Sequence, residues 1–177
     1  APVSQGKDLQ GWLAHGPKNE EFEAKFAEYC GTKFALSLNS CTSALELALW
    51  ANNITGEVII PSFTWCSTGN VVKLQGATPV FADIKVSNMS MDIADVEAKI
   101  TPKTEAIIVV HYAGLITNIQ AYKRLAETHG LLLIEDSAEC IGGLDGEIIA
   151  GSSGIGCFSF YPTKNFTTCE GGMLTTN

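Results

Sequence analysis

Short apolar runs alternate with helix-like segments along most of the chain, and this alternation limits the possible folds more than any other feature. The apolar runs occupy residues 33–38, 58–60, 78–82, 106–110 and 131–134. Segments with helical spacing lie at 19–29, 45–50, 64–74, 93–100 and 119–129. Strands that alternate with helices form a mostly parallel sheet with helices on both faces. The sequence therefore predicts a three-layer α/β/α domain.

The last part of the chain follows a different pattern. After Gly142-Gly143 the helical spacing stops, and strand-like segments follow at 148–149, 157–160 and 173–175, joined by glycine-rich turns. Residues 151–156 could be taken for a nucleotide loop, but they precede a strand instead of opening a helix after one, so a flexible turn is predicted. No repeat or linker divides the chain, and residues 1–177 are expected to form one domain.

Composition argues against several classes of protein. Lys and Arg total 11 and Asp and Glu total 19, for a net charge of −8. Nucleic acid is therefore not an expected partner, because phosphate neutralisation needs clustered basic side chains. No run of 18 apolar residues predicts a membrane span, and the first residues carry no secretion signal. The six cysteines form no C-x-x-C pair, which favours reduced thiols in a cytoplasmic protein. The three histidines do not lie at ligand spacing from the cysteines, so no metal site is predicted.

Open α/β sheets bind ligands beyond the carboxyl ends of their strands. Two turns at such positions, each between a strand and a helix, carry residues that suit a ligand. Ser40-Cys41-Thr42-Ser43 precede a helix, and amides and hydroxyls at a helix N-terminus suit a phosphate. The same residues are also ordinary helix caps. Trp65 lies in the second turn, where it could stack on a planar ligand or belong to the core.

Two further segments carry ionisable groups. Glu135 and Asp136 follow a strongly apolar strand, where a carboxylate needs a partner or a function, although a helix cap is an equal alternative. Lys164 follows the strand 157–160 and a proline-containing turn. A partly desolvated lysine can attack a carbonyl, whereas most lysines are simply solvated. His111 stands at another strand end facing the same region, as a structural or a catalytic residue.

A lysine, an acid, an aromatic ring and a phosphate cradle together match the needs of pyridoxal 5'-phosphate (PLP). The lysine forms a Schiff base and then moves the proton of the substrate's α carbon. The acid keeps the pyridinium nitrogen protonated, so that the ring can accept electrons. The four segments therefore predict a PLP site.

The chain resembles the DegT/DnrJ/EryC1/StrS family of sugar aminotransferases, which have the type I aspartate-aminotransferase fold. The resemblance runs in one order through 12–17, 39–45, 58–65, 76–83, 111–114, 135–136, 158–165 and 170–173. It implies a PLP-dependent enzyme that moves an amino group, usually from glutamate, to a nucleotide-linked keto sugar. Such enzymes make amino sugars for surface polysaccharides or antibiotics, and a homodimer is expected.

The resemblance also implies roles for single residues. Lys164 matches the Schiff-base lysine, Asp136 the acid at the pyridinium nitrogen and Trp65 the aromatic that stacks on the ring. The phosphate ligands that it implies are Thr42, Ser43 and Ser159. A relative that dehydrates sugars has a histidine where this chain has Lys164, so the lysine favours amino transfer.

Two departures from the family pattern keep alternatives open. Glu139 stands where the family commonly has Gln or His against the cofactor's phenolic oxygen, and a carboxylate there would repel a phenolate. The chain is also much shorter than family members, which predicts an incomplete large domain without the small C-terminal domain. The alternatives are a PLP-dependent sugar dehydratase or epimerase on the same scaffold, and a non-catalytic regulatory or binding relative.

Overall fold

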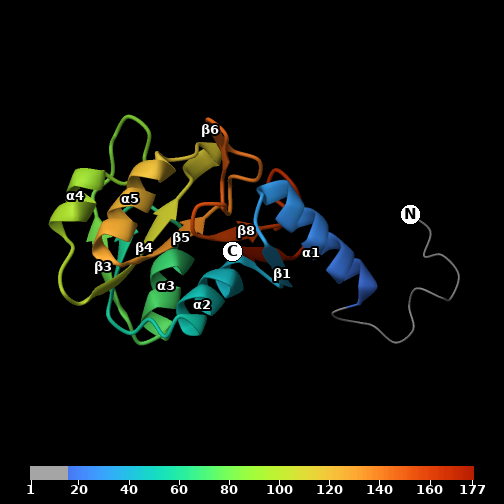
Figure 1. Ribbon diagram of the computed structural model, residues 1–177, viewed down its shortest axis with the longest axis horizontal. Coiled ribbons are helices and arrows are strands. Elements are labelled where there is room, and N and C mark those ends of the chain that lie inside the picture. Colours follow the sequence, from blue (N-terminus) through green and yellow to red (C-terminus); the bar gives the residue numbers. More distant parts are fainter. Residues whose placement is uncertain (1–15) are drawn as a thin grey trace, which may run out of the picture.

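A seven-stranded sheet forms the centre of the computed structural model, which describes residues 16–177 (Figure 1). His15 and residues 12–15 of the first family motif lie outside the described residues. The strand order is β1-β9-β8-β5-β4-β2-β3. The strands are β1 (Phe34–Leu38), β2 (Glu57–Pro61), β3 (Thr78–Ala82), β4 (Thr104–Val110), β5 (Leu132–Asp136), β8 (Ile155–Ser159) and β9 (Gly172–Thr176). A separate hairpin pairs β6 (Leu144–Asp145) with β7 (Ile148–Ile149).

The sheet is mostly parallel, as the sequence predicts. The pairs β2–β3, β2–β4, β4–β5 and β5–β8 are parallel, whereas β9 runs antiparallel to both of its neighbours, β8 and β1. The register places Val110 beside Asp136 and Asp136 beside Cys157. The carboxyl ends of β4, β5 and β8 therefore meet at one edge of the sheet.

Helices cover both faces of the sheet, which confirms the three-layer architecture (Figure 1). The helices are α1 (Pro17–Cys30), α2 (Cys41–Ala51), α3 (Cys66–Leu74), α4 (Ile93–Ala98) and α5 (Ile119–His129), with a 3₁₀ turn η1 (Tyr112–Gly114). On one face, Leu45 of α2 and Val71 of α3 pack with Ile134 of the sheet. On the other face, Val96 of α4 and Tyr122 of α5 pack with Leu133.

The first helix covers the β8–β9 side of the sheet through an aromatic cluster. Phe26 of α1 lies 5.0 Å from the ring of Phe158 and 5.6 Å from the ring of Phe160, in edge-to-face geometry. Phe22 also contacts Phe160, at 5.4 Å. Burying such rings is worth several kcal/mol, on the order of 3–5 each when the ring is removed. The cluster therefore fixes the end of β8, from which the Lys164 turn departs.

Strand β5 is longer than its apolar run predicts. It continues through Glu135 and Asp136 instead of ending before them. Successive residues of a strand point to opposite faces, so Asp136 shares the α2–α3 face with Ile134 while Glu135 lies on the other. Helix α3 begins at Cys66 because Trp65 has extended backbone angles (φ −65°, ψ 140°) and acts as its N-cap.

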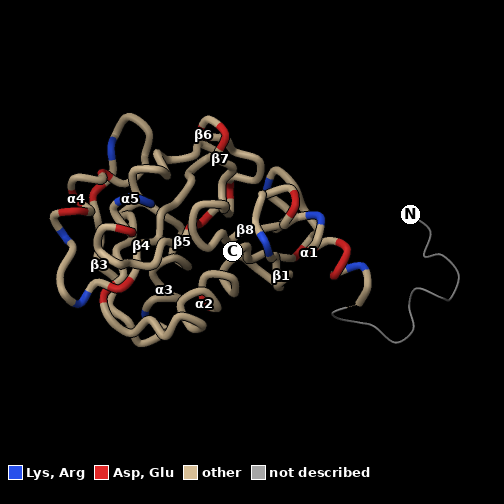
Figure 2. Tube along the Cα trace, viewed as in Figure 1, with Lys and Arg blue, Asp and Glu red and all other residues tan. Residues whose placement is uncertain are grey.

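The six cysteines are free thiols, and Cys30, Cys41, Cys140 and Cys157 are buried while Cys66 and Cys169 are exposed. Burial raises the pKa of Cys30 to about 12 and that of Cys140 to about 11. Among residues 16–177, no helix is long and apolar enough to cross a membrane, and no cluster of His, Cys, Asp and Glu residues could hold a metal ion. Lys and Arg positions are spread among Asp and Glu positions along the chain (Figure 2).

Candidate active site

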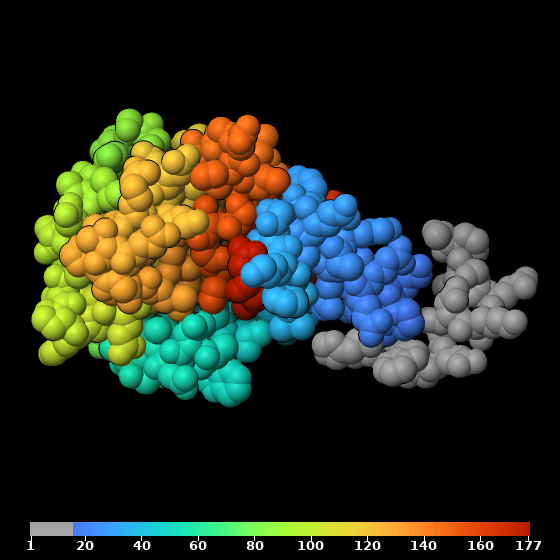
Figure 3. Space-filling model, viewed as in Figure 1, coloured from blue at the N-terminus to red at the C-terminus, as the bar shows by residue number. Residues whose placement is uncertain are grey.

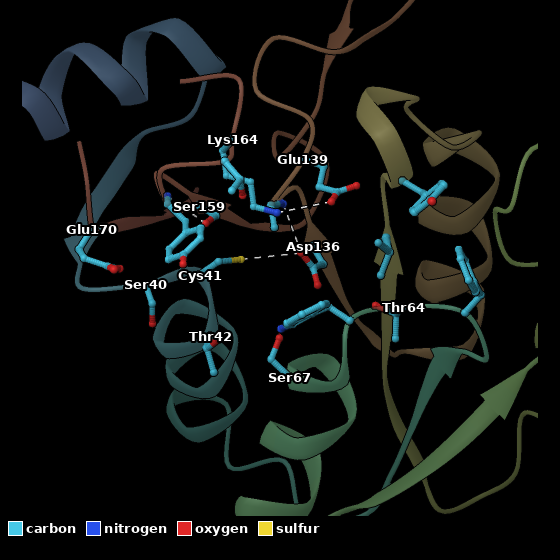
Figure 4. Close-up of a pocket in the computed structure, with 18 residues that line it drawn as sticks. Ser40, Cys41, Thr42, Thr64, Ser67, Asp136, Glu139, Ser159, Lys164 and Glu170 are labelled. Atoms are coloured by element: carbon cyan, nitrogen blue, oxygen red, sulfur yellow. Dashed lines mark hydrogen bonds and ion pairs between the residues drawn. The ribbon is translucent and has the colours of Figure 1, made fainter. Parts of the chain in front are cut away.

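A cavity of about 630 Å³ opens where the ends of β4, β5 and β8 meet the N-termini of α2 and α3. It gathers side chains that lie far apart in the sequence, from the Ser40 turn to the Glu170 turn (Figure 4). Six of the seven predicted site residues line it: Thr42, Trp65, Asp136, Glu139, Ser159 and Lys164. The structure therefore brings the predicted lysine, acid and aromatic ring to one cavity.

Asp136 is the most enclosed ionisable group that lines the cavity, with 5 % of its surface exposed. Its Oδ2 accepts a hydrogen bond from Thr68 Oγ1 at 3.0 Å, and its Oδ1 accepts one from the Ala138 amide at 3.2 Å. The Cys41 thiol donates to Oδ1 at 3.7 Å. Burial raises the pKa of Asp136, and these donors oppose that rise. The carboxylate is thus enclosed but oriented.

Lys164 lies in the turn after β8 and reaches back toward Asp136 and Glu139 (Figure 4). Its amide donates to the Tyr161 carbonyl at 2.9 Å, which closes the turn. Its Nζ lies 3.4 Å from Glu139 Oε1, and the lysine side chain is 21 % exposed. The other Glu139 oxygen accepts a hydrogen bond from the Ala113 amide at 2.9 Å. Glu139 is therefore held in place beside the Lys164 amine, and that amine is partly desolvated.

The turn before α2 is built for a close approach of two backbones. Ser40 caps the helix by accepting a hydrogen bond from the Ser43 amide at 3.2 Å. A Cβ atom on Gly172 would lie 2.2 Å from the Ser40 carbonyl carbon, so only glycine fits there. Ser40 and Thr42 line the cavity, whereas Ser43 does not, because its amide and hydroxyl are turned to Ser40. Ser159, 7 % exposed, completes this end of the cavity.

Aromatic side chains form the outer wall of the cavity. Trp65 lines it with 78 % of its surface exposed, so the alternative that this residue belongs to the core is wrong. Phe63 and Tyr112 pack edge to face, with ring centroids 5.2 Å apart, and line the same opening. A planar ligand would find uncovered aromatic surface here.

His111 does not face the cavity, contrary to the prediction from its strand-end position. Its side chain is fully buried and its Nε2 pairs with Glu135 Oε2 at 2.9 Å. The Thr117 amide donates to His111 Nδ1 at 3.3 Å. Since Nδ1 accepts, Nε2 carries the proton and donates it to the carboxylate. The neighbouring Val110, rather than His111, lines the cavity.

The Glu135 carboxylate binds the backbone of the glycine-rich segment 151–154. The amides of Gly151, Ser153 and Gly154 donate to its carboxylate at 2.9, 2.7 and 2.9 Å. Burial alone would raise the pKa of Glu135. The hydrogen bonds from His111 and the backbone amides outweigh burial, so the net effect is a lowered pKa. A turn is present where the glycines predict one, but three of its amides are bound by this carboxylate, so it is anchored rather than the flexible turn that was predicted.

The sequence did not single out several residues that the structure places at the cavity. Thr68 contacts Asp136. Tyr112 and Glu170, which lie in the family segments 111–114 and 170–173 but received no predicted role, line the opening. For Thr68 the available signal is its spacing from Thr64, four residues apart as on one face of a helix. Nothing in the sequence alone shows that this face meets the end of β5.

Comparisons with known proteins agree with this geometry. Residues 6–177 match the model of the DegT/DnrJ/EryC1/StrS aminotransferase family. The chain is 45 % identical over 170 residues to the spore coat polysaccharide biosynthesis protein SpsC of Bacillus subtilis (strain 168), covering 94 % of this chain and 44 % of SpsC.

Solved structures show the same fold. Spr1654 from Streptococcus pneumoniae, in its PLP form, matches with a TM-score of 0.91 and 33 % identity, over 96 % of this chain and 48 % of that one. DesI, solved in the presence of its TDP-sugar product, matches with a TM-score of 0.88 and 36 % identity, over 92 % of this chain and 42 % of that one. The chain thus spans less than half the length of these relatives, and over that span it belongs to the DegT/DnrJ/EryC1/StrS aminotransferase family.

Proposed function

We propose that this chain supplies the PLP-binding part of an aminotransferase that moves an amino group from an amino acid, glutamate, to a nucleotide-linked keto sugar. The observation that carries the proposal is the shared cavity. A lysine amine (Lys164) and a buried, oriented carboxylate (Asp136) open on it together, with an exposed indole (Trp65) at its rim. A set of this kind matches the needs of PLP and of few other ligands.

The residues present fit the cofactor. The Ser40–Thr42 turn at the N-terminus of α2 offers hydroxyls and a positive helix end to a phosphate, with Ser159 nearby. Gly172 lets the turn pack directly against β9, where any Cβ would collide with Ser40. Trp65 presents ring surface to a planar group. The expectation that Ser43 binds the phosphate has less support, because Ser43 caps the helix through Ser40.

Each ionisable group has a distinct task in this proposal. When bound, PLP supplies an electron-withdrawing ring that stabilises negative charge on the donor's α carbon. Asp136 would hold a proton on the pyridine nitrogen through its carboxylate. Lys164 would hold the cofactor covalently through Nζ and, once released, move a proton at the α carbon. Glu139, 3.4 Å from Nζ, gives the free ammonium a partner.

The proposed substrates and partners follow from the relatives and from charge. DesI was solved with a TDP-sugar product and SpsC is named for polysaccharide biosynthesis, which supports a nucleotide-linked sugar. Among the described lining residues, Lys164 is the one lysine or arginine, against the carboxylates of Asp136, Glu139 and Glu170. A phosphate would need further positive charge, which supports a homodimer whose second subunit contributes to the site. Six free thiols support a cytoplasmic location.

The test is a visible absorption spectrum of the 177-residue chain with added PLP. We expect a band in the wild type and in Lys73→Ala, whose lysine is exposed at the end of α3, but not in Lys164→Ala. Glutamate is expected to bleach that band. Absence of any Lys164-dependent band would contradict the PLP site.

A sugar dehydratase or epimerase on the same scaffold is the second candidate, and Glu139 is the observation that favours it. A carboxylate 3.4 Å from Lys164 Nζ is a second group able to exchange a proton beside the amine. A Lys164-dependent band that glutamate leaves unchanged would favour this candidate over amino transfer. A chain that binds a nucleotide sugar without PLP would instead indicate a non-catalytic relative.

A further inference from the structure

Asp136 stands at the end of a chain of two threonine hydroxyls. Thr68 of α3 is fully buried, and its Oγ1 lies 3.0 Å from Asp136 Oδ2. Thr64 Oγ1 lies 2.9 Å from Thr68 Oγ1, and Thr64 lines the cavity. Thr68 lies in the first turn of α3, and Thr64 precedes the Trp65 N-cap of that helix, where its hydroxyl contacts that of Thr68. A polar path therefore runs from the cavity wall to the buried carboxylate.

The direction of this path depends on the charge of Asp136. An ionised carboxylate can only accept hydrogen bonds, so Thr68 must donate its one proton to Oδ2. Thr68 can then only accept from Thr64, and Thr64 must donate inward. A protonated Asp136 would remove this constraint, since it could donate to Thr68 instead. Burial raises the pKa of Asp136, and the Thr68 hydroxyl opposes that rise, because a hydrogen bond to the charged carboxylate is stronger than one to the neutral acid.

Thr68 is the main support of one carboxylate oxygen. Oδ1 has two donors, the Ala138 amide at 3.2 Å and the Cys41 thiol at 3.7 Å. Among the described residues, Oδ2 has Thr68 as its hydrogen-bond donor. Hydrogen bonds to charged groups are stronger than neutral ones, and a buried carboxylate that loses one is correspondingly destabilised.

We propose that Thr68 is a positioning residue that orients Asp136 and keeps it ionised for the ring nitrogen of the cofactor. The proposal rests on the proposed function. The side chains that face Asp136 are the Cys41 thiol of α2, the Thr68 hydroxyl of α3 and the Cys157 thiol of β8, and the Lys164 amine reaches toward it from the turn after β8 (Figure 4). His111, which is paired with Glu135, acts on Asp136 through its charge rather than through a contact. The two thiols are buried and stay protonated, because burial raises the pKa of each well above its usual range. Thr68 is therefore the strongest neutral donor in this set.

The first measurement needs no cofactor. The carboxyl carbon of Asp136 is followed by ¹³C NMR as a function of pH in the full 177-residue chain, and its signal is assigned by its loss in Asp136→Asn. Thr68→Val keeps the side-chain shape and removes the hydroxyl, whereas Thr68→Ser keeps the hydroxyl. We expect the pKa of Asp136 to rise in the valine variant and to stay at the wild-type value in the serine variant.

A second variant leaves the Thr68 packing untouched. Thr64→Val removes the proton donated to Thr68, so the Asp136 pKa should move in the same direction as in Thr68→Val, but by less. If the Asp136 titration is the same in wild type, Thr68→Val and Thr64→Val, the positioning role is overturned. If Thr68→Ser shifts it as far as valine does, packing rather than the hydroxyl is responsible, and the proposal is again overturned.

The second measurement adds PLP and follows the Lys164-dependent band. We expect Thr68→Val to bind PLP about tenfold more weakly than wild type, and Thr68→Ser to restore most of the affinity. A wild type without such a band contradicts the proposed function, while the titration still decides the role of Thr68 toward Asp136. A wild type that binds PLP, with Thr68→Val binding equally well, overturns the Thr68 inference alone.

Discussion

Replacing Glu135 with Gln probes how strongly one buried side chain holds two loops together. The substitution keeps the shape of Glu135 and exchanges one carboxylate oxygen for an NH₂ group. Oε1 accepts from the Ser153 and Gly154 amides, and Oε2 accepts from the Gly151 amide and His111 Nε2. Whichever way the amide turns, its NH₂ group meets two donors.

The magnitude follows from this count. A buried donor that loses its acceptor costs about 1–3 kcal/mol, so two cost about 2–6 kcal/mol. A change of the His111 tautomer would not remove this cost. To accept from the new NH₂, Nε2 would have to lose its proton to Nδ1, and Nδ1 would then face the Thr117 amide as a second donor. A domain is stable by about 5–15 kcal/mol in total, so Glu135→Gln should remove a large part of the free energy of unfolding.

The assay is urea unfolding of the 177-residue chain at neutral pH, followed by circular dichroism. Glu139→Gln is the matched control, because it makes the same charge change in the same segment at a side chain that is 44 % exposed. The control should lie within about 0.5 kcal/mol of wild type. An unfolding free energy of Glu135→Gln equal to that of the control would refute the reasoning.

The same pair of proteins gives a pH dependence with a definite sign. The pKa of Glu135 is lowered in the folded state, so its stabilisation is fully present above the unfolded pKa of about 4.3. It is lost as pH falls through the lower, folded pKa. The stability difference between wild type and Glu135→Gln should therefore stay constant near neutral pH and shrink in acid. A difference that instead grows in acid would contradict the assignment of charge to Glu135.

Two further substitutions give contrasting outcomes. Asp136→Asn should leave the cofactor-free chain as stable as wild type, or more stable, at neutral pH. Burial raises the pKa of Asp136 in the folded chain, so the stability that this group contributes is present below its unfolded pKa and is lost as pH rises through its folded pKa. Urea unfolding measures the stability, and transamination should be lost. Gly172→Ala should destabilise by about 1–3 kcal/mol and weaken PLP binding, since its Cβ would lie 2.2 Å from Ser40. Gly69→Ala, whose Cβ would meet Ile60 at 3.4 Å, is the control, and equal thermal stability of the two alanine variants would count against the close-packed turn.

Much of the fold can be predicted from local patterns, because buried parallel strands are continuous apolar runs. The run 78–82 matches β3 and the spacing at 119–129 matches α5. The end of β5 could not be predicted in this way. Glu135 and Asp136 remain in the strand because the 151–154 loop and Thr68 satisfy them, and those partners are distant in the sequence. Strand direction is likewise invisible locally, so the antiparallel β9 was not foreseen.

The candidate site was predictable in its chemistry but not in its orientation. Lys164, Asp136 and Trp65 were identified because a lysine, an acid and an aromatic ring at strand ends suggest one cofactor, and the structure brings them to one cavity. Whether a strand-end side chain points into that cavity depends on a single position of register. His111 was expected to face it, yet Val110 does so instead. Ser43 was likewise expected at the cavity, but its amide donates to the Ser40 hydroxyl that caps α2.

The position of β9 has a consequence for how the protein is made. β1 pairs with β9 and with no other strand of the described sheet, joining Phe34 to Thr176 (Figure 3 shows the C-terminal segment in dark red beside the light blue residues near 34). At about 5–20 residues per second of synthesis, β1 waits on the order of ten seconds for its partner to be translated. During that time the first strand has no place in a sheet, and its long-range pairing makes folding slow. Until β9 (Gly172–Thr176) has been synthesised, β1 has no sheet partner among the described strands, and an unpaired strand can associate with other chains.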